Sequence, residues 1–119
     1  PDWTLQVANT PTVVTVSTEV AEKYPEVPIA WLRASVKAGK WIRDNTREAA
    51  ETFFEVTGES SLENIVQKLK EYDFVPNLSP KRLAALDIQK EFLLKHRYIE
   101  KDFSLEEWID DRFLKQALQ

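Results

Sequence analysis

Residues 26–45, EVPIAWLRASVKAGKWIRDN, form the segment around which the rest of the chain has to be arranged. Their spacing predicts one long amphipathic helix, because apolar residues recur three or four positions apart. One apolar stripe contains Ile29, Leu32 and Val36. A second stripe contains Trp31, Ala34, Ala38, Trp41 and Ile42. A helix with two apolar stripes has to be covered on two sides, so the sequence predicts a packing partner for each stripe.

Gly39 lies in the middle of this predicted helix. Glycine at such a position costs about 1 kcal/mol relative to alanine. We therefore expect another backbone segment to approach the helix closely there. Gly58, the only other glycine of the chain, is placed to end the following helix. Two isolated glycines cannot form a glycine-rich loop that holds a phosphate group.

Capping residues mark four further helix starts. They are Asn45 with Glu48, Ser60 with Glu63, Ser79 before Pro80, and Ser104 with Glu107. The helix after Pro80 is expected to bury Leu83, Leu86, Phe92 and Leu93. The last segment, SLEEWIDDRFLKQAL at residues 104–118, predicts a helix that docks through its apolar face on another part of the protein.

The residues before the long helix predict strands. Residues 3–7 alternate between apolar and polar positions, and residues 12–18, TVVTVST, are rich in β-branched side chains. Val13 and Val14 are adjacent, which is typical of a strand that is covered on both faces. One or two strands do not form a stable sheet by themselves. The sequence therefore predicts a sheet supplied from elsewhere, with a small helical bundle carrying a β-arm as the alternative.

Composition excludes several classes of function. The 119 residues suit one domain, with 16 basic and 20 acidic side chains and a net charge of −4. The basic residues are scattered, so we expect no nucleic-acid partner. The chain has no cysteine, which excludes disulfides, thiolate catalysis and zinc–thiolate sites. The first residues lack the pattern of a signal peptide, so an export signal would have to lie upstream of Pro1.

We predict no catalytic residue, no cofactor and no metal site. His96 is the only histidine, and its position near a predicted helix end is explained by the helix dipole. The acidic pairs Glu106-Glu107 and Asp110-Asp111 suit helix capping and solvated faces better than a metal ion. No G-x-S-x-G context surrounds a serine. The four tryptophans lie at apolar positions and are interpreted as core residues.

Three stretches together resemble a known family. They are TVVTVSTEVAEKYPE at residues 12–26, SVKAGKWIRDNTREAAETFFEVTG at residues 35–58, and residues 74–118, which contain VPNLSP and end in SLEEWIDDRFLKQAL. In their order and spacing they are similar to the C-terminal part of periplasmic substrate-binding proteins of ABC transporters for nitrate, sulfonates, taurine and thiamine precursors. The tail of a desulfinase that acts on an aryl sulfinate, built on the same scaffold, is also similar.

The resemblance implies an α/β parent fold of the type II periplasmic-binding kind. Residues 1–119 would be one C-terminal segment of it, mostly helical with one or two N-terminal strands. The implied function is capture of a small anionic or heteroaromatic solute, such as a sulfonate or nitrate, by lobe closure. The implied partner is an ABC permease, and the implied location is periplasmic or extracellular with a lipid anchor. Asn9, Thr10 and Thr12 are the positions here that could face the ligand.

Two other hypotheses remain open at this stage. One is an enzyme of the desulfinase or pyrimidine-precursor type, whose nucleophile would lie outside this chain. The other is a free-standing helical interaction module. A compact, cooperatively unfolding monomer would favour this module. If the chain is instead a fragment of a binding protein, its uncovered apolar surface leads us to expect that it associates with itself, with the edge of residues 12–17 as the expected pairing site.

Overall fold

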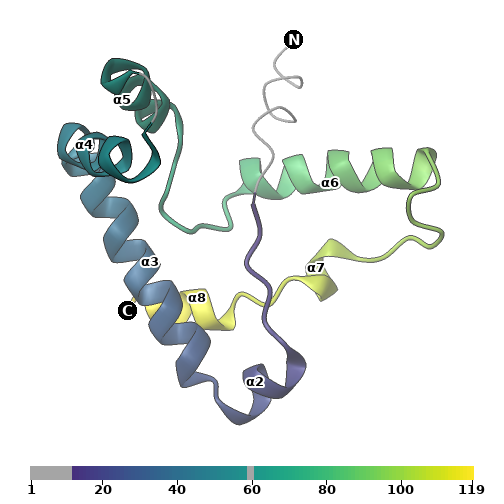
Figure 1. The fold of residues 1–119 in the computed structure, drawn as a ribbon. Helices are drawn as coiled ribbons and strands as arrows, with labels where there is room; N and C mark the ends of the chain where they lie inside the picture. Colours follow the sequence, from purple (N-terminus) through teal and green to yellow (C-terminus); the bar gives the residue numbers. More distant parts are fainter. Residues whose placement is uncertain (1–11, 59–60) are drawn as a thin grey trace.

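The computed structural model describes residues 12–58 and 61–119, and every regular element in these two ranges is a helix (Figure 1). The helices are α2 (Thr18–Lys23), α3 (Glu26–Asp44), α4 (Thr46–Thr57), α5 (Leu62–Glu71), α6 (Pro80–Lys95), α7 (Leu105–Trp108) and α8 (Arg112–Ala117). The expectation of an α/β fold is therefore wrong for this chain, which is a small helical domain over the described residues.

The predicted strand at residues 12–18 is the clearest error. Residues 12–17 are irregular and exposed, with Val13 at 48% and Val14 at 59% exposure, and Thr18 begins α2. β-propensity describes how a side chain fits a pleated, half-buried surface. Nothing in the described ranges offers this segment such a surface, so its valines remain in solvent. The other predicted strand, residues 3–7, lies outside the described residues.

Helix α3 is the central element, and it contacts α2, α4, α5 and α8 (Figure 1). The C-terminal helix α8 packs along α3 and buries Phe113 and Ala117, and the Arg33 guanidinium donates a hydrogen bond to the carbonyl of Gln116 at 3.2 Å. The chain end therefore docks in part, and within the chain: Phe113 and Ala117 pack on a helix, whereas Trp108 of the same predicted helix is 51% exposed. The expectation that the chain end packs on a sheet supplied from elsewhere is wrong for these two residues.

Only one of the two apolar stripes of α3 is covered. On the first stripe Val36 is buried, and Ile29 and Leu32 are half-buried. On the second stripe Trp31 is 52% exposed and Trp41 is 43% exposed. The prediction of a partner on each side is therefore fully met on one side only. Of the tryptophans predicted to be core residues, Trp31, Trp41 and Trp108 are exposed at the surface, and Trp3 lies outside the described residues.

The most deeply buried cluster lies between α4 and α5. Ala50, Ile65 and Val66 form it, with Leu62 and Leu69 packed against it. Gly58 ends α4 at a positive φ of 65°, as predicted. An ion pair between Arg47 and Glu63, 3.0 Å between Nη1 and Oε1, links the two helices at the surface. Ile65 is the one large side chain of the described residues that is fully buried.

The capping predictions have mixed outcomes. The hydroxyls of Ser79 and Ser104 accept hydrogen bonds from the amides of Arg82 and Glu107, at 3.4 and 3.3 Å. The cap of α5 is Ser61, one residue after the predicted Ser60. Asn45 makes no side-chain cap to α4 and instead donates to the carbonyl of Trp41 at 3.0 Å.

The predicted C-terminal helix is divided in two. Helix α7 ends at Trp108, and α8 begins at Arg112. Between them, Asp110 accepts hydrogen bonds from the backbone amide and the guanidinium of Arg112 at 3.1 and 2.9 Å. An aspartate that bonds to a nearby backbone amide competes with the helical pattern. The Asp110-Asp111 pair thus breaks the helix as well as its apolar face.

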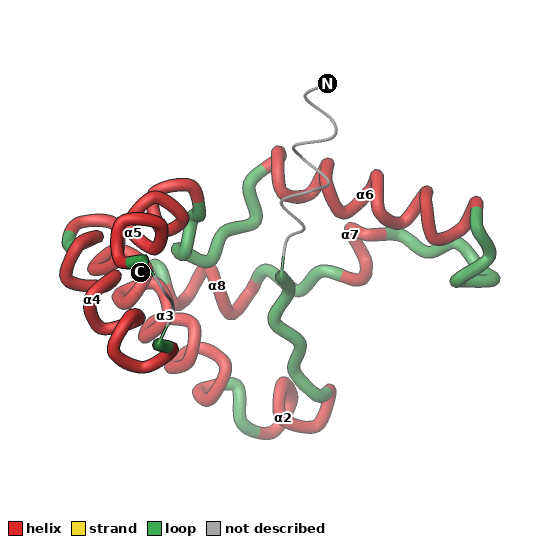
Figure 2. The backbone as a smooth tube through the Cα atoms, turned by 45° about the horizontal axis from the view of Figure 1, so that its top comes forward, coloured by secondary structure: helices red, strands yellow, loops and turns green. Residues whose placement is uncertain are grey.

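Helix α6 extends away from the other helices (Figures 1 and 2). Ala85 is its one buried residue, while Phe92 is 55% and Leu93 is 37% exposed, so the prediction that these two are buried is wrong. The radius of gyration of the chain is 16.9 Å. A compact domain of this length would have about 13.5 Å. The structure is therefore open, with α6 as its outlying arm.

Lys90 connects α6 to the segment that follows it. Its ammonium lies 3.1 Å from Oδ1 of Asp102, donates to the carbonyl of Phe103 at 2.9 Å, and lies 5.5 Å from the centre of the Phe103 ring. The pKa of Asp102 is lowered mainly by the hydrogen bond from Lys90, and to a smaller extent by the hydrogen bond from the backbone amide of Phe103.

None of the described helices is both long enough and apolar enough to span a bilayer.

Replacing Ile65 with alanine should remove most of the buried cluster. We expect the free energy of unfolding to fall by about 2–5 kcal/mol, because the substitution removes fully buried methyl groups and leaves a cavity. Val56→Ala is the matched control, since Val56 is 80% exposed in α4 and should change stability by less than about 0.5 kcal/mol. Urea unfolding followed by circular dichroism measures both. Equal losses for the two variants would contradict the assigned core.

The Lys90–Asp102 contact should make stability depend on pH. The folded pKa of Asp102 is lowered, so its contribution is present above the unfolded pKa of about 3.9 and is lost as the pH falls through the folded pKa. The stability difference between wild type and Asp102→Asn should therefore be largest near neutral pH and narrow in acid. Urea titrations at several pH values test this. In a Lys90→Met background, the effect of Asp102→Asn on the free energy of unfolding should depend less on pH. If that effect does not depend on pH in the wild-type background either, the proposed role of the pair is refuted.

Candidate functional site

One hollow of the described residues is an apolar groove of about 690 Å³, which we call the α3–α5 groove. Its walls come from α3, α4, α5 and the two aromatic residues that follow α5. The main lining side chains are Trp41, Ile42, Phe53, Val56, Leu69, Tyr72 and Phe74. Trp41 belongs to the uncovered stripe of α3. The groove therefore lies along the second stripe of α3, which α4 and α5 cover only in part, since Ile42 is half-buried and Trp41 is exposed.

The groove presents large apolar side chains to solvent. Val56 is 80% exposed, Tyr72 59%, Phe53 44%, Trp41 43% and Phe74 40%. Single exposed apolar residues are ordinary on protein surfaces, whereas a contiguous group on the walls of one groove marks an interaction surface. The chemistry that this surface offers is burial of an apolar partner.

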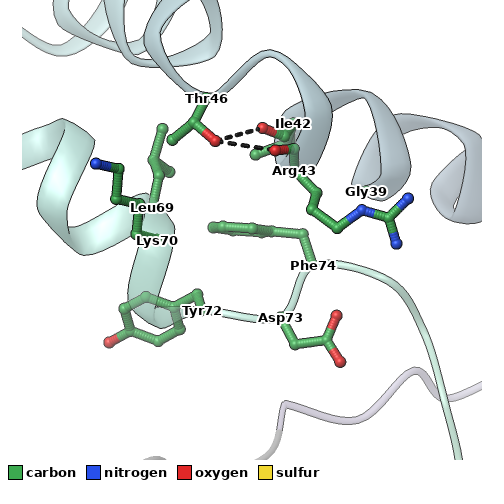
Figure 3. A pocket seen from close by; sticks show the side chains of 9 residues that line it. All are labelled: Gly39, Ile42, Arg43, Thr46, Leu69, Lys70, Tyr72, Asp73 and Phe74. Atoms are coloured by element: carbon green, nitrogen blue, oxygen red, sulfur yellow. Dashed lines mark hydrogen bonds between the residues drawn. The ribbon is translucent and has the colours of Figure 1, made fainter.

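A second hollow of about 320 Å³ adjoins the groove and is more polar (Figure 3). It shares Ile42, Leu69, Tyr72 and Phe74 with the groove. Gly39, Arg43, Thr46, Lys70 and Asp73 complete its lining. Figure 3 shows the Phe74 ring pointing into this hollow, with the Arg43 side chain on the α3 side and Asp73 at the edge.

Gly39 is what brings this loop onto α3. A Cβ atom at position 39 would lie 2.6 Å from the carbonyl oxygen of Phe74 and 2.8 Å from the amide nitrogen of Val75. Both distances are shorter than real Cβ contacts, and both neighbours are backbone atoms. The predicted close approach of another backbone is thus confirmed, and Phe74 is held between α3 and α5 because of it.

Hydrogen bonds of Asp73 fix the course of the same loop. Its two carboxylate oxygens accept from the Val75 amide at 3.1 Å and from the Asn77 side chain at 3.0 Å. Its own carbonyl accepts from the guanidinium of Arg82, in the first turn of α6, at 3.3 Å. Residues 73–77 are therefore tied both to themselves and to α6, which sets the direction in which α6 leaves the groove.

Two of the charged groups at the polar hollow, Arg43 and Asp73, have ion-pair partners, Asp44 and Arg82. Nε of Arg43 donates to Oδ1 of Asp44 at 3.0 Å, and this bond is the main reason that the pKa of Arg43 is raised, with a small contribution from the charge of Asp73. Thr46, at the start of α4, donates to the carbonyls of Ile42 and Arg43 in the last turn of α3, both at 3.1 Å. The hollow therefore supplies a polar edge to the groove.

Of the residues predicted to contact a ligand, only Thr12 lies within the described residues, and it does not line either hollow. Asn9 and Thr10 lie outside the described residues, and Thr12 is exposed in the irregular segment before α2. His96 lies at the C-terminal end of α6, as predicted, with its ring centre 4.4 Å from that of Phe92. Within the ranges 12–58 and 61–119, no three His, Asp or Glu side chains come together as a metal site would require.

Sequence analysis missed most of the groove. Phe53 and Val56 are spaced i, i+3 on the predicted helix that ends at Gly58, and this spacing was the available signal for one wall. Tyr72 and Phe74 follow the end of α5, and no helical spacing connects them with Phe53 and Val56. Their place at the groove depends on the Gly39 contact, which is a tertiary feature.

We compared the chain with protein-family models, with curated proteins and with solved structures, and no match was found. The resemblance to transporter substrate-binding proteins therefore remains a prediction from the sequence motifs.

Replacing Gly39 with alanine should destabilise the protein, although the same change inside an exposed helix gains about 1 kcal/mol. The new Cβ would meet backbone atoms of residues 74 and 75, so we expect a loss of about 1–3 kcal/mol. Ser35→Ala, one turn earlier on α3, is the control and should be nearly neutral or slightly stabilising. Urea unfolding measures both. A stabilised Gly39→Ala variant would contradict the close approach.

Proposed function

We propose that this chain is a docking segment of the solute-binding component of an ABC importer, and that it acts by reversible binding without bond chemistry. The observation that carries the docking part is the uncovered apolar surface. The second stripe of α3 and the α3–α5 groove together expose Trp31, Trp41, Phe53 and Val56. A surface of this kind is typical of a segment whose natural neighbour covers it.

The solute-binding part of the proposal is supported by the sequence. The three stretches that resemble the family cover residues 12–26, 35–58 and 74–118 in one order. The structure groups parts of all three around α3, since α2, α4 and α8 each contact it. The proposed solute is a small anion such as a sulfonate, taurine or nitrate, and the proposed partners are that solute and an ABC permease, in the periplasm or at a lipid-anchored position outside the cell.

The charges around the groove also bear on which residues of such a protein would contact the solute. The α3–α5 groove is apolar, and the Arg43 charge beside it is paired with Asp44. A small anion is bound best by unpaired donors and positive groups. We therefore assign no solute contact to the groove. Asn9, Thr10 and Thr12 remain the proposed solute-facing positions of this chain, and the described helices complete the body around them.

A free-standing helical interaction module is the second candidate. The cluster around Ile65 and the packing of α8 on α3 are the observations that favour it, because both are closed within the chain. In that case the groove would bind an apolar segment of another protein, and no solute would be involved.

The two candidates are separated by a ligand-dependent thermal melt. The reading frame that contains this chain should be expressed at its full length, beside the 119-residue chain, and melted with taurine, a longer alkyl sulfonate or nitrate. A ligand at about 100 times its dissociation constant stabilises the folded state by about 2.7 kcal/mol, which raises the midpoint by a few degrees. We expect this rise in the longer protein alone.

The outcome that would overturn the importer proposal is a full-length protein whose midpoint is unchanged by every one of these anions. A rise in the 119-residue chain by itself would contradict the expectation that this segment needs the rest of its parent protein to hold the solute. Chloride at the same concentration is the control for a general effect of salt.

A further inference from the structure

We propose that two copies of this chain associate by a reciprocal contact, in which α6 of each copy lies in the α3–α5 groove of the other. The proposal does not depend on the importer assignment, because it concerns surfaces that the 119-residue chain already carries. It follows from the character of α6, from the direction in which α6 leaves the groove, and from the area that each surface can bury.

Helix α6 has apolar residues on two opposite sides. Leu83, Leu86 and Leu93 lie on one side at helical spacing, and Ile88 and Phe92 lie on the other. A helix that is apolar on opposite sides is built to be covered on both. Its 16 residues give a rod of about 24 Å. In the structure it stands apart from the helical body, as both views show (Figures 1 and 2).

The groove of one copy cannot be filled by the α6 of the same copy without changing the loop between them. The Phe74 backbone is seated on Gly39. Asp73 is bonded to Val75, Asn77 and Arg82. This arrangement directs α6 outward from the groove. This loop does not restrict the α6 of a second copy. The groove and α6 can therefore cover each other between two chains without a change in the loop.

The apolar area that can be buried favours a reciprocal contact, in which each copy contributes both its groove and its α6, over a contact in which each copy contributes only one of these surfaces. Four aromatic side chains of the groove, Trp41, Phe53, Tyr72 and Phe74, are 40–59% exposed, and Val56 is 80% exposed. With roughly 200 Å² for each aromatic side chain, they present about 500 Å². A stable interface buries about 800 Å² on each partner, so the groove alone falls short.

The exposed side of α6 supplies the remaining area. Phe92 is 55% exposed, and Tyr98, whose ring stacks beside Phe92 at 6.4 Å between ring centres, is 72% exposed. These two residues add about 250 Å² on the same scale. A two-fold dimer buries the groove and this side of the helix in every copy, and thus comes close to the area of about 800 Å² on each partner. It also closes, so that no third copy is recruited.

The first experiment is light scattering with size exclusion on the 119-residue chain and three variants. We expect wild type to elute at twice the chain mass of 13.8 kDa. Phe53→Glu in the groove and Phe92→Glu on α6 should each elute as a monomer, because a carboxylate would be buried in an apolar contact. Tyr24→Glu, at a residue that is 53% exposed near α2, is the control and should remain dimeric. Circular dichroism confirms that each variant keeps its helices.

The second experiment identifies which surfaces meet, and it uses the absence of cysteine from the chain. Phe53→Cys and Phe92→Cys chains, mixed and oxidised, should form the mixed disulfide in preference to either symmetric one. A mixture of Tyr24→Cys with Phe92→Cys should not. Predominant Phe53→Cys homodimers would overturn the proposal in favour of a contact between two grooves.

A monomeric wild-type chain at the highest soluble concentration would also overturn the proposal. Suppose, in addition, that the thiol introduced by Phe53→Cys reacts with a thiol reagent in the 119-residue chain but not in the full-length protein. The groove is then occupied by another segment of the parent protein. The ligand-dependent melt of the full-length protein is a separate measurement, so failure of the dimer and failure of the importer proposal are distinguishable.

Discussion

The approach of the Phe74 backbone to Gly39 is the constraint on which most of this structure depends. A Cβ at position 39 would lie 2.6 Å from the Phe74 carbonyl oxygen, so only glycine permits the contact. The contact places Tyr72 and Phe74 at the groove, and the hydrogen bonds of Asp73 extend the effect to the start of α6. A glycine that weakens its own helix thus gives the chain both a groove and an arm that leaves it.

The pattern of burial explains why such a chain needs a neighbour. Helix α3 has two apolar stripes, and the chain covers the one that contains Val36 while Trp31 and Trp41 remain near half exposed. Covering a large aromatic side chain is among the strongest stabilising contributions that an interface can make. The side chains whose burial would stabilise a complex therefore remain exposed after the 119 residues have folded.

Local signals predicted what local interactions determine. The caps at Ser79 and Ser104, the αL turn at Gly58 and the helices around them are set by residues within one turn, and the sequence predicted them. The error at residues 12–17 has the opposite origin, because a strand forms only when another backbone satisfies its amides and carbonyls. Propensity could not reveal that this partner is missing from the described residues.

The groove illustrates a third situation, in which the sequence contained part of the information. Phe53 and Val56 share a predicted helical face, but the opposite wall comes from residues about twenty positions later. No spacing rule joins two segments whose meeting depends on a backbone contact to a third helix. Gly39 was the one residue that indicated such a contact, and the sequence could not identify which segment approached it.

Docking and stability are coupled in this chain. Ile65 is its one fully buried large side chain among the described residues, so the unfolding free energy that its own core supplies is small. A partner that binds only the folded state adds to that free energy according to its concentration and affinity. Whatever covers the groove and the tryptophans of α3 therefore does more than form a complex, because it also determines how much of the chain is folded.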